Sequence, residues 1–514
     1  MAKTSAKNDL KINLFLKSLA KTSIFVVLIL FFSKLLTYIY RVLVARYFGP
    51  EVYGLFSLSI MILGLFVTVS SIGLVDGLIR FIALYRGKKE ENKIRYLLKF
   101  SSVILLVSGL VSGFLLFILS DSIAANIFNN SALSFYLKVF SFLIVLSLFL
   151  NFFLAILRAY EQVSEYSFLQ SLFQNLVRII LLVLFIFIGF GADSAIVSSF
   201  FLSVLATIIV AYLICRHIIP DFLIKSDLNN KEKYKIRVSL LTYSWPLIFL
   251  GVISNLFGWT DSFIIGYFKT IEQVGFYNAA VPIAALIAIA PEIFMQLFFP
   301  MVTKEFTKKR YNIIRELSKQ VQKWIFMINL PLLLIILIFP GVIINLLFGA
   351  EYLVAENALR ILAIGTFFMS LSQASIHLLA MLGKSKTSLA NVTIFSILNI
   401  ILDIILIPKY GLSGAAFATA VSYSLMGLAF ILQVKHEINI LPFRRKMITL
   451  FIASIIPAIF LLIASKIIAI TLLNLILCGA GFILIYVALI FLTGCLDKND
   501  LMILLAIKRK VFKV

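Results

Sequence analysis

The chain has 514 residues, of which 62% are hydrophobic and only 13% are charged. A soluble globular protein of this composition would expose far too much apolar surface to water, so the composition excludes that class. A net charge of +23 would indicate a nucleic-acid partner for a soluble chain, but in a membrane protein the topology explains it, and we expect no nucleic-acid partner.

Apolar stretches long enough to cross a hydrocarbon core of about 30 Å recur along almost the whole sequence. We therefore predict an all-α, polytopic membrane protein with about 14 transmembrane helices. In chain order, the expected spans lie near residues 22–45, 54–82, 97–119, 137–158, 168–188, 194–215, 241–264, 275–298, 324–346, 358–382, 387–407, 412–434, 447–465 and 471–493.

The basic residues are distributed unequally between the two sides of this bundle. Most of the 46 lysines and arginines fall in the terminal tails and in every second loop, and the other loops hold only Arg46, Lys269, Lys409 and Lys466. By the positive-inside rule, we expect both termini in the cytoplasm and the chain in the cell membrane as a multi-pass protein. The basic loops are also expected to contact anionic membrane lipids.

A short polar and aromatic segment occurs twice, as YFGPEVYGLF from Tyr47 and as YFKTIEQVGFY from Tyr267. Gly54 and Gly275 take matching places in the two copies. Further pairs at the same separation of 220 or 221 residues are Ile127-Phe128 with Leu347-Phe348, and Gly191 with Gly411. The pattern predicts an internal duplication of six spans, and because six is even, both copies enter the membrane in the same direction.

This duplication divides the chain into three expected parts. Residues 1–225 form an N-terminal six-helix lobe, residues 226–440 form a C-terminal six-helix lobe, and residues 441–514 add a transmembrane helix pair and a basic cytoplasmic tail. The two lobes are expected to be parallel repeats, related by a pseudo-two-fold axis along the membrane normal. Rocking of one lobe against the other would open a central cleft to one side of the membrane at a time.

Three residues of the first predicted span form the main site hypothesis. A charge deep in lipid costs about 2.5–3.5 kcal/mol on insertion scales, so it suggests a function. Lys34 lies near the middle of the span, and Tyr38 and Arg41 follow at helical spacing. They could form a cationic, substrate-binding wall of a wet cleft that receives an anionic group. Alternatively, Lys34 pairs with a neighbouring helix, or Arg41 reaches the outer headgroups.

The segment GLVDGLIRF carries a second pair of charges. Asp76 and Arg80 lie four residues apart, a spacing that favours an ion pair within one helix. Arg80 is a further candidate for substrate binding and Asp76 for gating or coupling. A merely topological role of Arg80 near the inner surface is an equal alternative.

Asp261 in GWTDSF follows Arg41 by 220 residues, the separation of the repeat. Opposite charges would therefore lie on equivalent faces of the two lobes. We predict an outer-side latch between Arg41 and Asp261 that forms when the cleft opens inward. The alternative is that Asp261 simply lies near the outer interface.

Glu292 lies beside Pro291, in a span that also contains Pro282. Prolines interrupt the hydrogen bonds of a helix, and freed carbonyls beside a carboxylate could hold a coupling Na⁺ or H⁺. A salt bridge from Glu292 to a cation of the next loop is an equal alternative.

Three further polar residues lie within spans. Arg178 and Asp403 fall at roughly corresponding places in the fifth and eleventh spans, and they either pair or line the cleft. His377 is alone in its span and is more typical of a packing residue than of a proton relay.

The sequence contains no evident set of catalytic or cofactor-binding residues. Cys215, Cys478 and Cys495 have no metal-binding spacing, and the 3 histidines add no ligand set. GKSKTS at Gly383 lacks the upstream glycine of a phosphate-binding loop. We therefore expect a transporter that is not an enzyme, has no cofactor or metal and acts as a monomer.

The segments YFGPEVYGLF and SIGLVDGLIRF resemble the polysaccharide biosynthesis, or O-antigen flippase (Wzx-type), family of the multidrug/oligosaccharidyl-lipid/polysaccharide exporter superfamily. The resemblance covers roughly residues 10–490. It implies an alternating-access flippase that moves a polyprenyl-phosphate-linked oligosaccharide or polysaccharide unit from the inner to the outer leaflet. It also implies that Lys34, Arg41 and Arg80 neutralise the lipid pyrophosphate and that the last helix pair forms a groove for the polyprenyl tail.

The sequence is also compatible with two other functions. A cation-coupled multidrug exporter would need an acidic cleft, to which Asp261 and Glu292 could contribute, although the cations of the first lobe oppose this reading. A membrane glycosyltransferase or polymerase would need large outer loops with paired acids. For the flippase, the expected partners are a lipid-linked sugar, membrane lipids and a coupling Na⁺ or H⁺.

Overall fold

The computed structural model describes residues 2–219, 228–467 and 472–495. Within these ranges every regular element is a helix and no strand occurs. They contain 11 helical stretches that are long and apolar enough to cross a membrane, together with a shorter apolar helix, Leu477–Leu492. The prediction of an all-α, polytopic membrane protein is therefore confirmed.

Two of the long helices each correspond to more than one predicted span. Helix α1 (Ala2–Ser70) contains a non-helical residue, Gly49, with φ 84° and ψ 175°. Helix α15 (Ser385–Ile438) has 54 residues and a similar break at Gly411, with φ 55°. A straight helix of that length would measure about 80 Å, far more than one crossing needs. The 11 stretches therefore do not give the number of crossings directly, and the count of 14 stays a prediction.

The chain divides into two compact units. The first unit is Ile29–Asn278, and the second unit consists of Met1–Leu28 and Ala279–Val514. The first unit holds the first copy of the repeat and also the beginning of the second copy. Its limits therefore differ from those of the lobes expected at 1–225 and 226–440, which describe the repeat of the sequence and stay a prediction.

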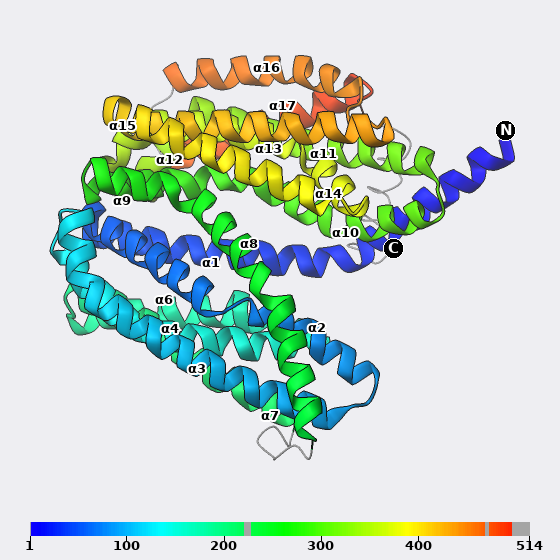
Figure 1. Cartoon of the computed structure of the whole chain (residues 1–514). Helices are drawn as coiled ribbons and strands as arrows, with labels where there is room; N and C mark the ends of the chain where they lie inside the picture. The colour runs from blue at the N-terminus through cyan, green and yellow to red at the C-terminus, as the bar shows by residue number, and fades with distance from the viewer. Residues whose placement is uncertain (1, 220–227, 468–471, 496–514) are drawn as a thin grey trace. The chain divides into compact units, whose positions relative to one another are not determined.

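The first unit contains most of α1 and the helices that follow it (Figure 1). These are α2 (Leu74–Gly87), α3 (Glu91–Ser122), the π-helical η1 (Ile123–Ile127), α4 (Ala132–Ala159), α5 (Val163–Ser167), the π-helical η2 (Phe168–Phe173), α6 (Gln174–Ile188), α7 (Ala192–Ile218), α8 (Asn230–Phe268) and the start of α9 (Ile271–Ala285). Within this unit, α3 packs along α4, α7 packs against both α4 and α6, and α8 packs against α2.

Small residues allow α8 to approach α1 and α2 closely. A Cβ atom at Gly73 would lie 2.1 Å from the backbone oxygen of Ser244, and one at Gly64 would lie 2.4 Å from the ring of Trp259. Asn255 of α8 also donates a hydrogen bond of 2.7 Å to the Thr68 hydroxyl. Close backbone approach through glycine and interhelical polar bonds are typical of helix pairs in membranes, where water does not drive association.

The repeated segments have the same local geometry in both copies. The rings of Tyr47 and Phe48 lie 4.9 Å apart at 85°, and those of Tyr267 and Phe268 lie 5.0 Å apart at 84°. Both tyrosines are exposed, as is typical of aromatic side chains at a membrane interface.

A second pair of matched positions also agrees. Phe128 and Phe348 each follow directly after a helix. Each has a φ of −106°, and both side chains are buried. The agreement supports a duplication at the level of local structure as well as sequence.

The second unit contains the rest of the described helices (Figure 1). After α9 these are the 3₁₀-helix η3 (Leu286–Ala288), α10 (Ile289–Thr307), α11 (Tyr311–Ile338), α12 (Pro340–Leu347), the 3₁₀-helix η4 (Ala350–Ala355), α13 (Glu356–Ser370), α14 (Gln373–Met381), α15, α16 (Lys446–Ile467) and α17 (Leu472–Leu492). Here α13 packs along α15, and α10 packs against α11 and α14.

The last two helices pack against each other and against α11. An apolar cluster joins Phe339, which follows α11, to Leu461 of α16 and Phe482 of α17. Lys323 of α11 is fully buried and donates a hydrogen bond of 3.3 Å to the backbone oxygen of Cys495, just beyond α17. Two helices therefore occupy the place of the expected pair and pack against α11. That both cross the membrane stays a prediction, and the basic tail predicted after them lies outside the described residues.

Candidate functional site

Arg178 of α6 joins three helices of the first unit. Its guanidinium carbon lies 3.9 Å from the ring centroid of Phe200 and 5.5 Å from that of Tyr40. Its Nε donates a hydrogen bond of 3.3 Å to the Ser203 hydroxyl. Tyr40 belongs to α1, and Phe200 and Ser203 belong to α7. A planar guanidinium stacks well on aromatic faces, so this arrangement can hold the charge within the bundle.

Hydrogen bonds between side chains fix these helices around Arg178. Asn175, which precedes it on α6, is buried and donates a hydrogen bond of 3.1 Å to the Thr37 hydroxyl of α1. The buried hydroxyls of Tyr40 and Ser199 lie 3.3 Å apart and share a further bond between α1 and α7. The position of the guanidinium therefore depends on hydrogen bonds between polar side chains of these three helices.

Arg41 of α1 lies beside the same group of residues and is half-buried. It forms a hydrogen bond with the hydroxyl of Tyr53, which in turn donates to the backbone oxygen of Asn278 at 3.0 Å. The charge of Arg41 also acts on the hydroxyl of Tyr38 and on Arg178. We refer to the set as the arginine cluster: Tyr38, Tyr40, Arg41, Tyr53 and Arg178.

The arginine cluster contains no acidic counterpart of its own. Among the residues that the structure describes, neither Arg41 nor Arg178 forms an ion pair with a carboxylate. The Tyr38 hydroxyl is buried and has no hydrogen-bond partner in that part of the chain. Two cations that repel each other, next to an unsatisfied hydroxyl, form a site whose natural complement is an anion with several acceptor oxygens.

The predicted stripe of Lys34, Tyr38 and Arg41 is only partly contained in this cluster. Helix α1 is regular through all three positions, so they follow one another at the expected helical spacing. Tyr38 and Arg41 are members of the cluster, whereas Lys34 is exposed and precedes Tyr38 by four residues. A role of Lys34 in substrate binding stays a prediction.

The predicted ion pair between Asp76 and Arg80 is wrong for this structure. Both side chains are exposed on α2, and no ion pair joins them in the described chain. The guanidinium of Arg80 instead lies 4.2 Å from the ring centroid of Tyr243 on α8. An aromatic face from a neighbouring helix competes successfully with an exposed carboxylate, because an exposed pair contributes little.

Asp261 also has a partner that the sequence did not suggest. Its buried carboxylate accepts a hydrogen bond from the Tyr277 hydroxyl, and both residues belong to the second copy of the repeat. Arg41 forms no ion pair in the part of the chain described here, so the latch between Arg41 and Asp261 is not closed in this structure.

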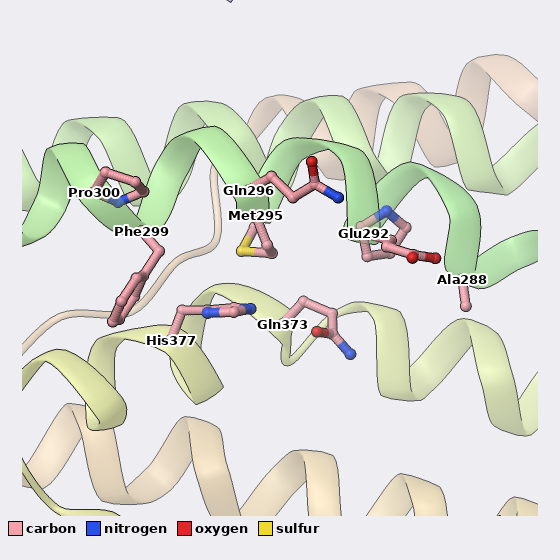
Figure 2. Close-up of a pocket in the computed structure, with 9 residues that line it drawn as sticks. Ala288, Glu292, Met295, Gln296, Phe299, Pro300, Gln373 and His377 are labelled. Carbon is pink, nitrogen blue, oxygen red and sulfur yellow. The ribbon is translucent and has the colours of Figure 1, made fainter. Parts of the chain in front are cut away.

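The second unit contains a pocket of about 490 Å³ between α10 and α14. Figure 2 shows Glu292 and Met295 of α10 facing Gln373 and His377 of α14. The complete lining consists of Ala288, Pro291, Glu292, Met295, Gln296, Phe299, Pro300, Gln373 and His377. We call this cavity the α10–α14 pocket.

Breaks in the helices before α10 and before α14 determine where these side chains lie. The 3₁₀-helix η3 ends at Ala288, so Glu292 falls in the first turn of α10, and a turn at Leu371-Ser372 precedes α14, which begins at Gln373. The ring of His377 lies 5.6 Å from that of Phe299. The structure therefore brings Glu292 and His377, which sequence reasoning treated separately, into one pocket.

Other predicted candidates lie elsewhere or are not supported. Asp403 is fully buried on α15 of the second unit, whereas Arg178 belongs to the arginine cluster of the first unit. No group of three or more histidine, cysteine or acidic residues suitable for a metal ion occurs among the described residues.

Comparison with known proteins gives a consistent picture. The family model described as polysaccharide biosynthesis protein matches residues 19–306, and the MatE model matches residues 246–405. The uncharacterized membrane protein MJ1068 of Methanocaldococcus jannaschii is 26% identical over 90% of this chain and 92% of its own length. The putative O-antigen transporter of Shigella flexneri is 24% identical over 73% of this chain and 88% of its own.

The fold is also similar to that of a solved transporter. The structure of the lipid II flippase MurJ in an inward closed conformation matches with a TM-score of 0.70 and 19% sequence identity. The match covers 91% of this chain and 98% of that protein. The chain therefore has the all-helical fold of that protein.

Proposed function

The chain belongs to the polysaccharide biosynthesis protein family, and we propose on this premise that it is a flippase for a lipid-linked glycan. It would move a polyprenyl-phosphate-linked oligosaccharide or polysaccharide unit from the inner to the outer leaflet by alternating access. The names of its relatives, a putative O-antigen transporter and a lipid II flippase, agree with this proposal. The function is transport, and the relatives are transporters rather than enzymes.

The arginine cluster is the observation that carries this proposal. A glycan attached through a pyrophosphate presents several negatively charged oxygens, and guanidinium groups bind such oxygens with paired hydrogen bonds. Arg41 and Arg178 offer two guanidiniums without a carboxylate partner in the described chain, and Tyr38 adds a hydroxyl. The free-energy cost of placing these two guanidinium charges in a membrane would be offset when an anionic headgroup is bound.

The remaining features of the proposed transporter follow from the sequence. We place it in the cell membrane with both termini in the cytoplasm, because basic residues concentrate in the tails and alternate loops. Lys34 and Arg80 are proposed to attract the headgroup at the edges of the path, and Asp76 is proposed to take part in gating. A coupling Na⁺ or H⁺ and a monomeric state complete the proposal.

The direct test is a leaflet-resolved flipping assay. The purified chain is reconstituted into vesicles that contain a fluorescent polyprenyl-pyrophosphate-sugar, and an impermeant quencher reports the outer leaflet over time. We expect faster equilibration with the wild type than in empty vesicles, and a large loss for Arg41→Ala and Arg178→Ala. Arg158→Ala is the matched control, because Arg158 also stacks on a ring, that of Tyr166, outside the cluster. Equal rates with and without protein would refute the flippase.

A cation-coupled multidrug exporter is the second candidate. The MatE match over residues 246–405 and the carboxylate of Glu292 in the lining of the α10–α14 pocket favour it. The same vesicles can be loaded with a cationic dye and energised with a Na⁺ or H⁺ gradient. Gradient-driven dye movement that Glu292→Gln abolishes, without any movement of the sugar lipid, would select the exporter.

A further inference from the structure

We propose that the α10–α14 pocket is a subsite for the sugar hydroxyls of the transported glycan. The inference rests on the proposed flippase function and adds to it the part of the chain that recognises the sugar. Four polar side chains would contact the glycan, and one aromatic ring would pack against it: Glu292, Gln296, Gln373, His377 and Phe299.

The polar side chains of the pocket match hydroxyl groups better than they match a charge. A sugar hydroxyl both donates and accepts hydrogen bonds. The two glutamine side chains each supply donors and an acceptor, the carboxylate of Glu292 accepts, and the imidazole of His377 does either. A binding site for a bare cation would instead present mainly oxygen atoms, and a site for pyrophosphate would present cations, of which this lining has none besides the imidazole.

The polar and apolar residues are arranged in separate rows. On α10, Glu292 and Gln296 lie four residues apart, and Met295 and Phe299 form a neighbouring row at the same spacing. On α14, Gln373 and His377 are also four residues apart, and both line the pocket on the side opposite α10 (Figure 2). A sugar ring has hydroxyls around its edge and an apolar face of C–H groups. The polar residues of the pocket can form hydrogen bonds with the hydroxyls, and the ring of Phe299 and the thioether of Met295 can pack against the apolar face.

The shape of the pocket is set by backbone interruptions on both sides. Helix α10 begins after a 3₁₀ turn, and α14 begins after a two-residue turn. Interrupted helices expose polar groups within a membrane only where they line a cavity, and transporters use them at substrate sites. The pocket volume of about 490 Å³ falls in the range of small-ligand sites.

The test compares two lipids that differ only in the sugar. Vesicles contain either bare polyprenyl pyrophosphate or the same lipid carrying N-acetylglucosamine, and flipping of each is measured at limiting lipid concentration. We expect Gln373→Leu and Glu292→Leu to slow the sugar-bearing lipid about tenfold or more, as loss of one hydrogen bond to a polar ligand predicts. Both variants should move the bare lipid at the wild-type rate.

Matched variants separate recognition from folding. Glu351→Leu removes an exposed carboxylate of the second unit that lies outside this lining and should leave both rates unchanged. Glu292→Gln keeps an acceptor in place and should be less affected than Glu292→Leu. If the wild type flips both lipids and the pocket variants slow both equally, or slow neither, the sugar subsite is wrong. The flippase function would still stand. If the wild type flips neither lipid, the proposed function itself fails and the subsite fails with it.

Discussion

Gly54 and Gly275 make reciprocal contacts across the repeat. A Cβ atom at Gly54 would lie 2.0 Å from the backbone oxygen of Ile271, and a Cβ atom at Gly275 would lie 2.0 Å from the backbone oxygen of Pro50. Each carbonyl precedes the glycine of its own copy by four residues. Equivalent surfaces of the two copies therefore contact each other, as at an interface with two-fold symmetry. All four residues belong to the first unit, and the symmetry of their contacts agrees with the duplication of the sequence.

Substitution of either glycine should destabilise the protein. Gly54→Ala and Gly275→Ala each place a methyl group on a backbone carbonyl that cannot move aside, and we expect a loss of about 1–3 kcal/mol, as for overpacking. The measurement is the midpoint of thermal unfolding in detergent. Gly258→Ala is the control, since its methyl group would meet nothing within 4 Å on helix α8 and should be neutral or slightly stabilising. Equal behaviour of Gly54→Ala and Gly258→Ala would contradict the close approach.

Arg178 should not be replaceable by lysine. Arg178→Lys keeps the charge but loses the stacking on Phe200 and the bond to Ser203. We expect about tenfold slower flipping at limiting lipid for Arg178→Lys and a larger loss for Arg178→Gln, because the latter removes the charge as well. Initial rates against lipid concentration give both values. Identical losses for the two variants would mean that the charge of Arg178 does not contact the substrate.

Asp261 should be coupled to Tyr277 in stability. Asp261→Ala removes the acceptor and Tyr277→Phe removes the donor of a buried hydrogen bond, and each should cost about 1–3 kcal/mol. Because both changes break the same bond, the double variant should cost less than the sum, which thermal unfolding can measure.

The same design tests the latch. In the conformation described here, Arg41→Gln and Asp261→Asn should have additive effects on stability. Transport that is lost on reversing either charge and restored when both are reversed would show that the latch closes in another state of the cycle. Without such rescue, the pairing is not part of transport.

The last helix pair should be required for a stable protein. A chain that ends at residue 440 lacks the Cys495 carbonyl that Lys323 contacts and the apolar surface that covers Phe339. The truncation removes one hydrogen-bond acceptor of a buried lysine and uncovers apolar surface, so this variant should aggregate on size-exclusion chromatography. Adding Lys323→Met to the truncation should recover part of the monodisperse protein. A truncated chain with Lys323 as stable as the full chain would contradict this account.

Much of the fold could be predicted from local sequence properties. Apolar length alone gave the helices, and the positions of Gly49 and Gly411 agree with the expected boundaries because glycine adopts positive φ without strain. The turn at Leu371-Ser372 was not predicted, since it contains neither glycine nor proline. It depends on packing, because Ser372 lies against Gly427 of α15, where a Cβ atom would meet the serine hydroxyl at 3.2 Å.

The candidate sites were harder to predict than the helices. The cost of charge in lipid drew attention to Arg41, but the contacts of Arg178 with Tyr40 and Phe200 join helices that are distant in the sequence. The rule for helical neighbours failed at Asp76 and Arg80 because it considers a single helix and not the ring of Tyr243. Neither site could be assembled without tertiary contacts.

The paired rings at Tyr47-Phe48 and Tyr267-Phe268 have kept almost identical geometry, whereas Arg41 has an acidic counterpart in Asp261. In an assembly of two identical subunits, every charge of one copy would recur in the other. A single chain with two copies has no such constraint, because a substitution in one copy leaves the other unchanged. The aromatic pairs are alike in both copies, whereas Arg41 and Asp261 give the copies opposite charges at matching positions, so each copy can contact a different part of an asymmetric substrate.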